Sequence, residues 1–575
     1  MNDKPIWSPS NITASQMAKF TRYVENKYAV NLPTYEDLHQ WSVNYSAEFW
    51  ESVWQEYSIT YSQPYTTVIK NGNAFYNTQW FVGSRLNYAE NLLQRRDEHT
   101  ALVAYLDNGQ RTCITYTALY EKVNGLAHHF REQGVTVGDR VAGVVANTIE
   151  TVIAMLATTS IGAIWSSCSP DFGIPASLDR FSQIQPKLLI AVDGYYYGGK
   201  TIDCIDKIAA LDEQLAVTQT IIIPLLNSQI GNTLVNHKNI ISWQVIMQKK
   251  ITSELVFEQL PFDHPLFILY SSGTTGKPKC IVHSAGGTLI QHIKEHRLHT
   301  NMDDKDVVFY FTTCGWMMWN WLISSLACGS TIVLYDGNPL VTDNALLDLI
   351  DKEKISVFGS SAKFFDILEK NNIQANKNHS LDSLKTILST GSPLVAERFE
   401  YIYSSFKKDI LLASISGGTD IVSCFLLGNP TLPVYAGKLQ SAGLGMEVKI
   451  FNEQGESVEN KKGELVCTQP FPCCPIGFWD DNDNERFIQA YFSRFPNIWA
   501  HGDYVEKTAQ GGYIIYGRSD TVLNPGGVRI GTAEIYRQVE KIASVKESIA
   551  VGQQWDDDER IILFVVMKDN ITLDS

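Results

Sequence analysis

Short apolar runs alternate with amphipathic segments along most of the chain after about Thr100. The runs Ala101–Leu106 and Arg140–Ala146 are predicted to be buried β-strands. The segments that follow them, Thr117–Glu132 and Thr148–Ile161, place apolar residues at helical spacing and predict helices. The same short apolar pattern predicts further strands at Leu188–Val192, Thr220–Leu225, Val307–Thr312 and Thr331–Tyr335. Alternating strands and helices are typical of mostly parallel sheets covered by helices, so we predict an α/β fold.

Several more predicted strands run directly into loops of small and hydroxyl-bearing residues. The strand and loop pairs are Leu266–Tyr270 with Ser271–Gly276, Ile355–Phe358 with Gly359–Ala362, Leu384–Leu388 with Ser389–Pro393, and Ile410–Ala413 with Ser416–Asp420. In open α/β sheets ligands bind beyond the carboxyl ends of the strands, and small residues there let the backbone approach a ligand. One such loop is usually an ordinary turn, but four in one chain predict a shared pocket.

Composition and charge narrow the classes of partner. The chain has 575 residues, a length that suggests several domains. Of these residues 44% are hydrophobic and 19% charged, a balance typical of globular proteins. The formal net charge of -15 argues against nucleic acid or an anionic membrane as the main partner. The ten cysteines have no zinc-site spacing and are expected to be reduced thiols. There is no apolar N-terminal leader and no run of 18 apolar residues, so we expect a cytoplasmic protein.

Residues 1–90 differ from the rest, because their aromatic-rich patterns predict helices at Tyr35–Trp41 and Ser46–Tyr57.

The most informative loop is Tyr270–Cys280, with the sequence YSSGTTGKPKC. Its glycines expose backbone N–H groups, its hydroxyls donate hydrogen bonds, and Lys277 and Lys279 add positive charge. These are the features of a polyphosphate site. The loop is not the Walker A motif of P-loop NTPases, because Ser271 stands at the first glycine position and Pro278 replaces the final Ser or Thr.

This loop closely resembles the phosphate-binding signature of the adenylate-forming superfamily, which comprises acyl-CoA synthetases, peptide-synthetase adenylation domains and beetle luciferases. Further motifs follow in that family's order, namely Gly391-Ser392-Pro393, Thr419-Asp420, Gly463-Glu464-Leu465, His501-Gly502-Asp503, Gly517-Arg518-Ser519-Asp520, and Gly527 with Arg529. Each motif alone could be a surface turn, a helix cap or a solvated charge. The ordered set covers roughly Ala101 to Met567, and the chain is identified as a member of the superfamily.

The resemblance implies a role for each matched residue. The residues expected to bind ATP or AMP are Ser271, Ser272, Gly273, Thr274, Thr275, Gly276, Lys277, Lys279, Gly391, Ser392, Pro393, Gly418, Thr419, Asp420, Asp503, Arg518 and Arg529. The residues expected to act in catalysis are Thr275, Thr419, Asp420 and Arg529. Asp420 is expected to bind Mg²⁺, Gly527 to contact CoA, and Asp520 to be the hinge. Two departures from the family pattern are Ser416, where an aromatic ring usually stacks on adenine, and Asp420, which is one methylene shorter than the usual Glu.

The resemblance also implies the domain organisation. Residues 1–519 are expected to form a large N-terminal domain of helix-covered sheets with a distorted barrel, and residues 520–575 the hinge and part of a small α+β C-terminal lid. The family's lid usually runs on the order of 100 residues beyond the hinge and carries an adenylation lysine. Thr521–Ser575 holds no counterpart of that lysine, so residues 1–575 are expected to bind AMP or an acyl-adenylate but to synthesise little adenylate.

Several segments are similar to those of the acetoacetyl-CoA synthetases: Trp80–Leu93, Ser166–Gly173, Ile281–His296, Phe309–Leu322 and Ser389–Leu394. The implied reaction joins acetoacetate to CoA in two steps, with ATP, Mg²⁺ and CoA as cofactors and co-substrates. Other readings are an acetyl-, propionyl- or other short-chain acyl-CoA synthetase, a luciferase-like oxidase, or a nucleotide-binding module without catalytic activity.

The acyl pocket gives a physical argument in the same direction. Gly417 stands where acetyl-CoA synthetases carry a tryptophan that closes the pocket, so a longer acyl chain is expected to fit. By the same matching Trp316, Met317, Met318 and Thr390 are expected to line the pocket, although the methionines fit an ordinary core equally well. One methylene changes binding by only about 1–3 kcal/mol, so size alone does not separate acetoacetate from propionate or butyrate. The 3-keto group is expected to need a hydrogen-bond donor, which the sequence does not identify.

Overall fold

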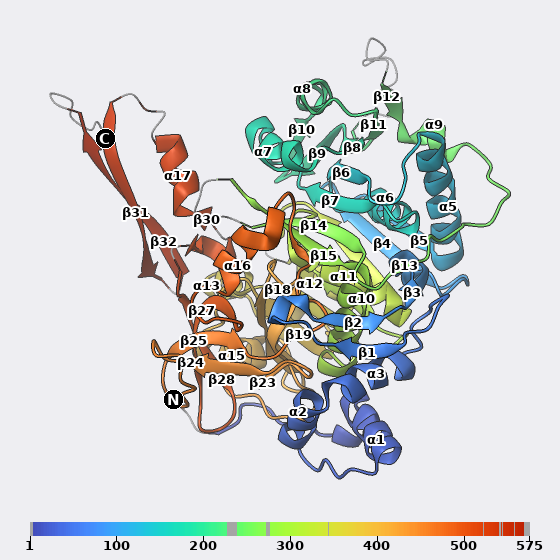
Figure 1. The fold of residues 1–575 in the computed structure, drawn as a ribbon. Coiled ribbons are helices and arrows are strands. Elements are labelled where there is room, and N and C mark those ends of the chain that lie inside the picture. Colours follow the sequence, from blue (N-terminus) through green and yellow to red (C-terminus); the bar gives the residue numbers. More distant parts are fainter. Residues whose placement is uncertain are drawn as a thin grey trace.

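The computed structural model describes residues 4–226, 239–271, 277–342, 344–520, 522–528, 530–539, 542, 544–556 and 558–568 (Figure 1). Within them two large sheets carry the fold. The first has the strand order β12 (Ile240–Ser242), β11 (Gln219–Ile223), β8 (Leu188–Val192), β6 (Arg140–Val144), β7 (Ile164–Cys168), β14 (Pro265–Ser271), β15 (Lys279–Ser284) and β26 (Gly477–Phe478). The second has the order β20 (Leu411–Ser414), β19 (Thr386–Thr390), β18 (Val357–Ser361), β16 (Val307–Tyr310), β17 (Thr331–Asp336), β4 (Thr100–Leu106) and β5 (Arg111–Thr115).

Most strand pairs in both sheets are parallel, as the alternating pattern predicts. The antiparallel pairs lie at one end of each sheet, where β15 joins β14 and β26 in the first and β5 joins β4 in the second. Parallel strands need helical crossovers that cover the sheet faces. The mixed α/β class is therefore confirmed.

Helices fill the space between the two sheets. The middle layer comprises α5 (Tyr116–Glu132), α6 (Ile149–Ser160), α10 (Ala285–Lys294) and α11 (Met317–Ser324), which share one hydrophobic cluster with the inner faces of both sheets. Every residue of α6 except Glu150 is buried, and every residue of α11 is buried. A helix that is apolar all round requires cover on all sides, and the two sheets provide it.

Further helices cover the outer faces. On the first sheet lie α7 (Ile174–Ile184) and α8 (Ile205–Leu215), and on the second α12 (Ala345–Glu353), α13 (Ala362–Lys370) and α15 (Ala396–Ser405). The result is five alternating layers of helices and sheets. The N-terminal helices α1 (Gln16–Tyr28), α2 (Tyr35–Asn44) and α3 (Ser46–Glu56) join the central cluster through their aromatic side chains. The patterns at residues 35–41 and 46–57 thus correspond to real helices.

Two smaller sheets follow in the chain. One comprises β21 (Ser416–Gly418), β22 (Ser423–Leu427) and β23 (Ser441–Ala442), and the other β24 (Val448–Phe451), β25 (Gly463–Cys467), β27 (Trp499–Lys507) and β28 (Tyr513–Arg518). The distorted barrel implied by the resemblance does not close among the described residues. The physical reason is that β23 has only two residues and pairs with β22 alone, so a single isolated bridge between Leu439 and Tyr513 takes the place of a strand ladder between the two sheets.

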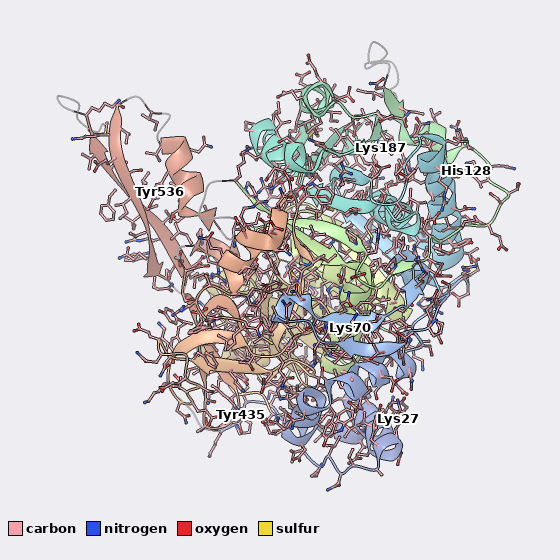
Figure 2. The ribbon with its side chains drawn as sticks, in the orientation of Figure 1. Lys27, Lys70, His128, Lys187, Tyr435 and Tyr536 are labelled. Atoms are coloured by element: carbon pink, nitrogen blue, oxygen red, sulfur yellow. The ribbon has the colours of Figure 1, made fainter. Side chains whose placement is uncertain are left out.

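The last part of the chain is a long hairpin of β31 (Val545–Trp555) and β32 (Asp558–Met567), preceded by α17 (Thr532–Val539). Figure 1 shows the hairpin projecting from the body of the molecule. Tyr536, labelled on α17 in Figure 2, accepts a hydrogen bond of 3.1 Å from the backbone N–H of Ala550 and fastens the helix to the hairpin. Across the described ranges, none of the helices is both long enough and apolar enough to span a bilayer.

Candidate active site

Three of the small-residue loops meet at one edge of the second sheet. Parallel pairing places Ser361 opposite Thr390, and Ser389 opposite Ser414, so β18, β19 and β20 end side by side. The carboxyl ends of these strands, where the sequence predicts a shared pocket, therefore lie side by side. The fourth loop begins at Ser271, at the end of β14 in the first sheet.

The base of the phosphate loop reaches the other motifs through an aromatic residue. Ser271 pairs with Lys279 across β14 and β15, and the Lys279 Nζ lies 5.2 Å from the centroid of the Tyr491 ring. The Tyr491 hydroxyl donates a hydrogen bond of 2.5 Å to the Asp420 Oδ1. Tyr491 ends α16 (Glu485–Tyr491) and stacks on Trp499 with ring centroids 4.0 Å apart. Tyr491 therefore connects β15 of the first sheet to the loop that carries Asp420. None of the sequence motifs includes this tyrosine.

Asp503 and Arg518 form the centre of a charged group. They lie opposite each other on β27 and β28, and the Arg518 Nη1 donates to the Asp503 Oδ1 at 2.9 Å. The Arg518 Nε also donates to the Asp520 Oδ1 at 3.1 Å. Burial lowers the pKa of Arg518, but the carboxylates of Asp503, Asp520 and Asp420 outweigh it and raise the pKa above its ordinary value. The guanidinium is thus a permanent cation that is 10% exposed, the kind of group that orients an anionic ligand.

Two further residues hold this charged group in place. Glu464, a member of the Gly463-Glu464-Leu465 motif with no expected role in the site, is buried and accepts a 2.6 Å hydrogen bond from the Gly502 N–H. Burial raises the pKa of the Glu464 carboxyl. The His501 Nε2 lies 3.2 Å from the Gly417 carbonyl oxygen and joins β27 to β21. Two motifs 84 residues apart are therefore in direct contact.

The segment expected to lie against adenine follows β19. Gly391 has φ +96°, a conformation that favours glycine, and the Asn524 Nδ2 donates to its carbonyl oxygen at 2.9 Å. A Cβ atom added at Gly391 would lie 3.4 Å from the Trp316 ring and 3.6 Å from the Gly527 Cα. The residue expected to contact CoA therefore packs against the residue expected to contact adenine.

The acyl-pocket residues come from neighbouring elements. Trp316 is the N-cap of α11, and Met317 and Met318 follow it as buried residues of the central cluster. The Thr390 hydroxyl donates to the Ile415 carbonyl oxygen at 2.7 Å, two residues before Gly417.

Gly417 has a second requirement for a small residue. A Cβ atom added there would lie 2.0 Å from the Ser423 carbonyl oxygen and 2.4 Å from the Cys424 Cα. Any side chain at this position therefore displaces the β21–β22 hairpin, whatever its effect on an acyl group.

Two parts of the expected site lie outside the described residues. They are Ser272–Gly276 of the phosphate loop, including the expected catalytic Thr275, and Arg529. Most of the remaining expected residues lie at or just beyond the ends of β14, β19, β21 and β28, whereas Asp503 lies within β27, Gly527 in a 3-10 turn, and Trp316–Met318 at the start of α11.

Comparison with known proteins identifies relatives along nearly the whole chain. A family model described as AMP-binding enzyme matches residues 89–472, and one described as acetyl-coenzyme A synthetase N-terminus matches residues 35–92. The acetoacetyl-coenzyme A synthetase of Rhizobium meliloti (strain 1021) is 46% identical over 99% of this chain and 88% of its own length. The acetoacetyl-CoA synthetase of Danio rerio is 47% identical over 99% of this chain and 86% of its own. The solved structure of the acetoacetyl-CoA synthetase from Streptomyces lividans superposes with a TM-score of 0.86 at 38% identity, covering 99% of this chain and 88% of that one.

Proposed function

The chain belongs to the acetoacetyl-CoA synthetase family of AMP-binding enzymes, and we propose that it is the ATP-dependent ligase that joins acetoacetate to CoA. The single observation that carries the proposal within the site is the convergence of Asp420 and Asp503 on Arg518. Gly391, which follows β19, lies against Trp316 at the start of α11. This arrangement offers charged and backbone groups to a nucleotide beside a buried apolar helix, α11.

The first half-reaction makes the carboxylate reactive. A carboxylate oxygen of acetoacetate attacks the α-phosphorus of ATP, the bond between the α-phosphorus and the bridging oxygen breaks, and pyrophosphate leaves with that oxygen. Catalysis of this kind rests on positioning and on neutralising charge. We propose that the loop from Ser271 to Lys279, with the charges of Lys277 and Lys279, binds the pyrophosphate. Asp503 would bind the ribose hydroxyls, and Arg518 would orient the nucleotide.

We propose that Mg²⁺ binds at the site mainly through the phosphates of ATP. No group of three or more His, Cys, Asp or Glu side chains is placed to bind a metal in the part of the chain that the structure describes. Mg²⁺ is commonly bound through one or two carboxylates together with substrate phosphates, so a site with one carboxylate fits. Asp420, with Thr419 beside it, would supply that carboxylate and bring the ion to the α-phosphate.

The second half-reaction transfers the acyl group. The CoA thiolate attacks the carbonyl carbon of the adenylate, a carbon–sulfur bond forms, and AMP leaves with the oxygen that linked it to the carbonyl. We propose that residues 520–575 act as a lid over this step, with Asp520 as its hinge. The contact between Gly527 and Gly391 supports an arrangement in which the lid borders the path to the adenylate.

The proposal is tested by following thioester formation by the full-length protein, with a complete lid, with acetate, propionate, butyrate and acetoacetate in the presence of ATP and CoA. We expect the highest kcat/KM with acetoacetate, with AMP and pyrophosphate as products. A higher kcat/KM for acetate or propionate would instead support the alternative short-chain acyl-CoA synthetase, and release of ADP would contradict an acyl-adenylate.

A further inference from the structure

A buried amide on α11 lacks the hydrogen bonds that its neighbours have. Asn320 is 1% exposed, and neither its Nδ2 nor its Oδ1 has a hydrogen-bond partner among the described residues. Other polar groups of the same helix are satisfied: the Trp319 Nε1 donates to Asn147, and the Trp321 Nε1 donates to Glu295. A buried amide without a partner is costly, so it requires an explanation such as a ligand.

The helix geometry places Asn320 beside the expected acyl pocket. Residues three and four positions apart share one face of a helix, so Asn320 lies on the face of Trp316 and Met317. Helical side chains lean toward the N-terminus of their helix, so the amide is directed back toward these two residues. The Trp316 ring lies against Gly391, at the nucleotide end of the site.

The far side of the same face is closed by a buried polar network. The Ser324 Oγ, one turn beyond Asn320, lies 2.7 Å from the His292 Nδ1, and the His292 Nε2 lies 2.5 Å from the Val422 carbonyl oxygen. Val422 lies in the turn of the β21–β22 hairpin, which also carries Gly417. Asn320 thus stands between the nucleotide segment and the hairpin, at the inner end of the space expected to take the acyl group.

The chemistry of the amide matches the substrate of the proposed function. The 3-keto oxygen of acetoacetate only accepts hydrogen bonds, and the carboxamide Nδ2 of Asn320 supplies two donor hydrogens. Thr390 and Ser324 offer no free donor, because their hydroxyls already donate to the carbonyl oxygens of Ile415 and Trp321. We infer that Asn320 donates a hydrogen bond to the 3-keto oxygen and selects acetoacetate over unsubstituted short-chain acids, an inference that rests on the proposed function.

The test compares acetoacetate with butyrate, which has the same number of carbons and no keto group. Asn320→Leu keeps a similar side-chain volume and removes the donor. We expect its kcat/KM for acetoacetate to fall roughly 10- to 100-fold while that for butyrate changes less than about threefold. Asn320→Ala, which shortens the side chain instead, is also expected to lower the ratio of kcat/KM for acetoacetate to kcat/KM for butyrate. Leu322→Met, a volume-conserving change elsewhere on α11, should leave the ratio unchanged.

Thermal stability separates recognition of the keto group from a structural role. Replacing an amide that has no partner by an apolar group of similar shape should leave the melting temperature of Asn320→Leu unchanged or higher. A lower melting temperature with equal losses for both acids would overturn the inference, as would a ratio that stays at the wild-type value in both variants. Failure of the wild-type protein to prefer acetoacetate over butyrate would instead overturn the proposed function itself.

Discussion

Asp503 and Arg518 hold each other in position through their 2.9 Å contact. Under the proposed function Asp503 also binds the ribose hydroxyls. In Asp503→Asn the side-chain amide no longer offers a charged acceptor to the Arg518 guanidinium or to the ribose hydroxyls. Hydrogen bonds to charged groups contribute about 1.5–3 kcal/mol, so we expect the dissociation constant of AMP to rise roughly 10- to 150-fold. Calorimetric titration with AMP measures this change without depending on catalysis.

The matched control for this substitution is Glu506→Gln. Glu506 lies three residues along the same strand and accepts a hydrogen bond of 2.7 Å from the Tyr516 hydroxyl, away from the charged group. We expect this control to bind AMP like the wild type. An unchanged dissociation constant for Asp503→Asn would show that Asp503 does not hold the nucleotide.

At the residue scale the sequence identified motif members but not the residues that connect them. Asp420 follows from its motif, whereas Tyr491, which binds it, lies 71 residues away in a segment with no motif. Asn320 is a single amide within an apolar helix, and neither its spacing nor its neighbours distinguish it in the sequence. Gly417 was expected to open the acyl pocket, but the structure adds a steric demand from Ser423 that no local pattern reveals.

At the scale of elements, the segment from β15 to the π-helical turn Glu295–His299 carries four buried histidines: His283, His292, His296 and His299. Burial lowers the pKa of each, to about 3 for His283. For His299 the hydrogen bonds support the neutral form, because its Nδ1 lies 2.9 Å from the Gly428 carbonyl oxygen while its Nε2 accepts from the Leu444 N–H.

These depressed pKa values predict that the protein loses stability in mild acid. The unfolded chain binds more protons than the folded chain between the folded pKa, about 3 for His283, and the ordinary value of 6.5. Stability from this source is therefore fully present above about pH 6.5 and declines as the pH falls, by up to about 1.4 kcal/mol per pH unit for each histidine. We expect the melting temperature to be level from pH 8 to pH 7 and to fall steadily from pH 6.5 to pH 5.

Two variants connect this loss to the buried histidines. His299→Asn removes one titrating group. It should reduce the slope of the unfolding free energy against pH by up to about 1.4 kcal/mol per pH unit, the contribution of one proton. His128, labelled on α5 in Figure 2, has a side chain that is 44% exposed, and His128→Asn should leave the dependence unchanged. A melting temperature that stays constant down to pH 5 in the wild type would contradict the prediction.

The strands of the parallel sheets could be predicted because each is a short apolar run with clear boundaries. Leu188–Val192 follows Pro186 and precedes Asp193, and β8 has the same bounds as predicted. The β21–β22 hairpin could not be predicted, because Ser416–Gly418 has no apolar alternation and its pairing depends on the buried Glu295. That carboxylate accepts hydrogen bonds from the Ser423 hydroxyl and the Cys424 N–H, both on β22.

At the scale of the whole molecule, charged contacts join the C-terminal hairpin to the helices of the second sheet. On α13, the Lys370 Nζ lies 2.5 Å from the Asp556 Oδ2 and the Lys363 Nζ lies 3.7 Å from the Asp558 Oδ2. Asp558 also accepts a hydrogen bond of 2.9 Å from the Gly526 N–H, beside Gly527. These contacts hold the hairpin and the Pro525–Gly527 turn in the arrangement in which Gly527 meets Gly391.

Under the proposed function this arrangement borders the path of the CoA thiolate, so weakening it should affect thioester formation more than nucleotide binding. Lys370→Glu replaces attraction to Asp556 by repulsion, and it also removes the 3.3 Å contact of Lys370 with Asp366 on the same helix. Exposed ion pairs contribute about 0–1 kcal/mol, so we expect the rate from preformed acetoacetyl-adenylate and CoA to fall by roughly two- to fivefold at low salt. The loss should shrink as salt screens the exposed charges.

The charge swap Lys370→Glu with Asp556→Lys restores opposite charges and should recover most of the rate, whereas Lys377→Glu on the separate helix α14 (Ala375–Asn378) should have no effect. AMP affinity, measured in parallel, should stay within about twofold in all of these variants, because the pair lies on the surface. Equal losses of AMP binding and thioester formation, or no recovery in the swapped pair, would show that the contact supports the fold as a whole. Recovery confined to thioester formation would establish that the docking of the hairpin controls the second half-reaction.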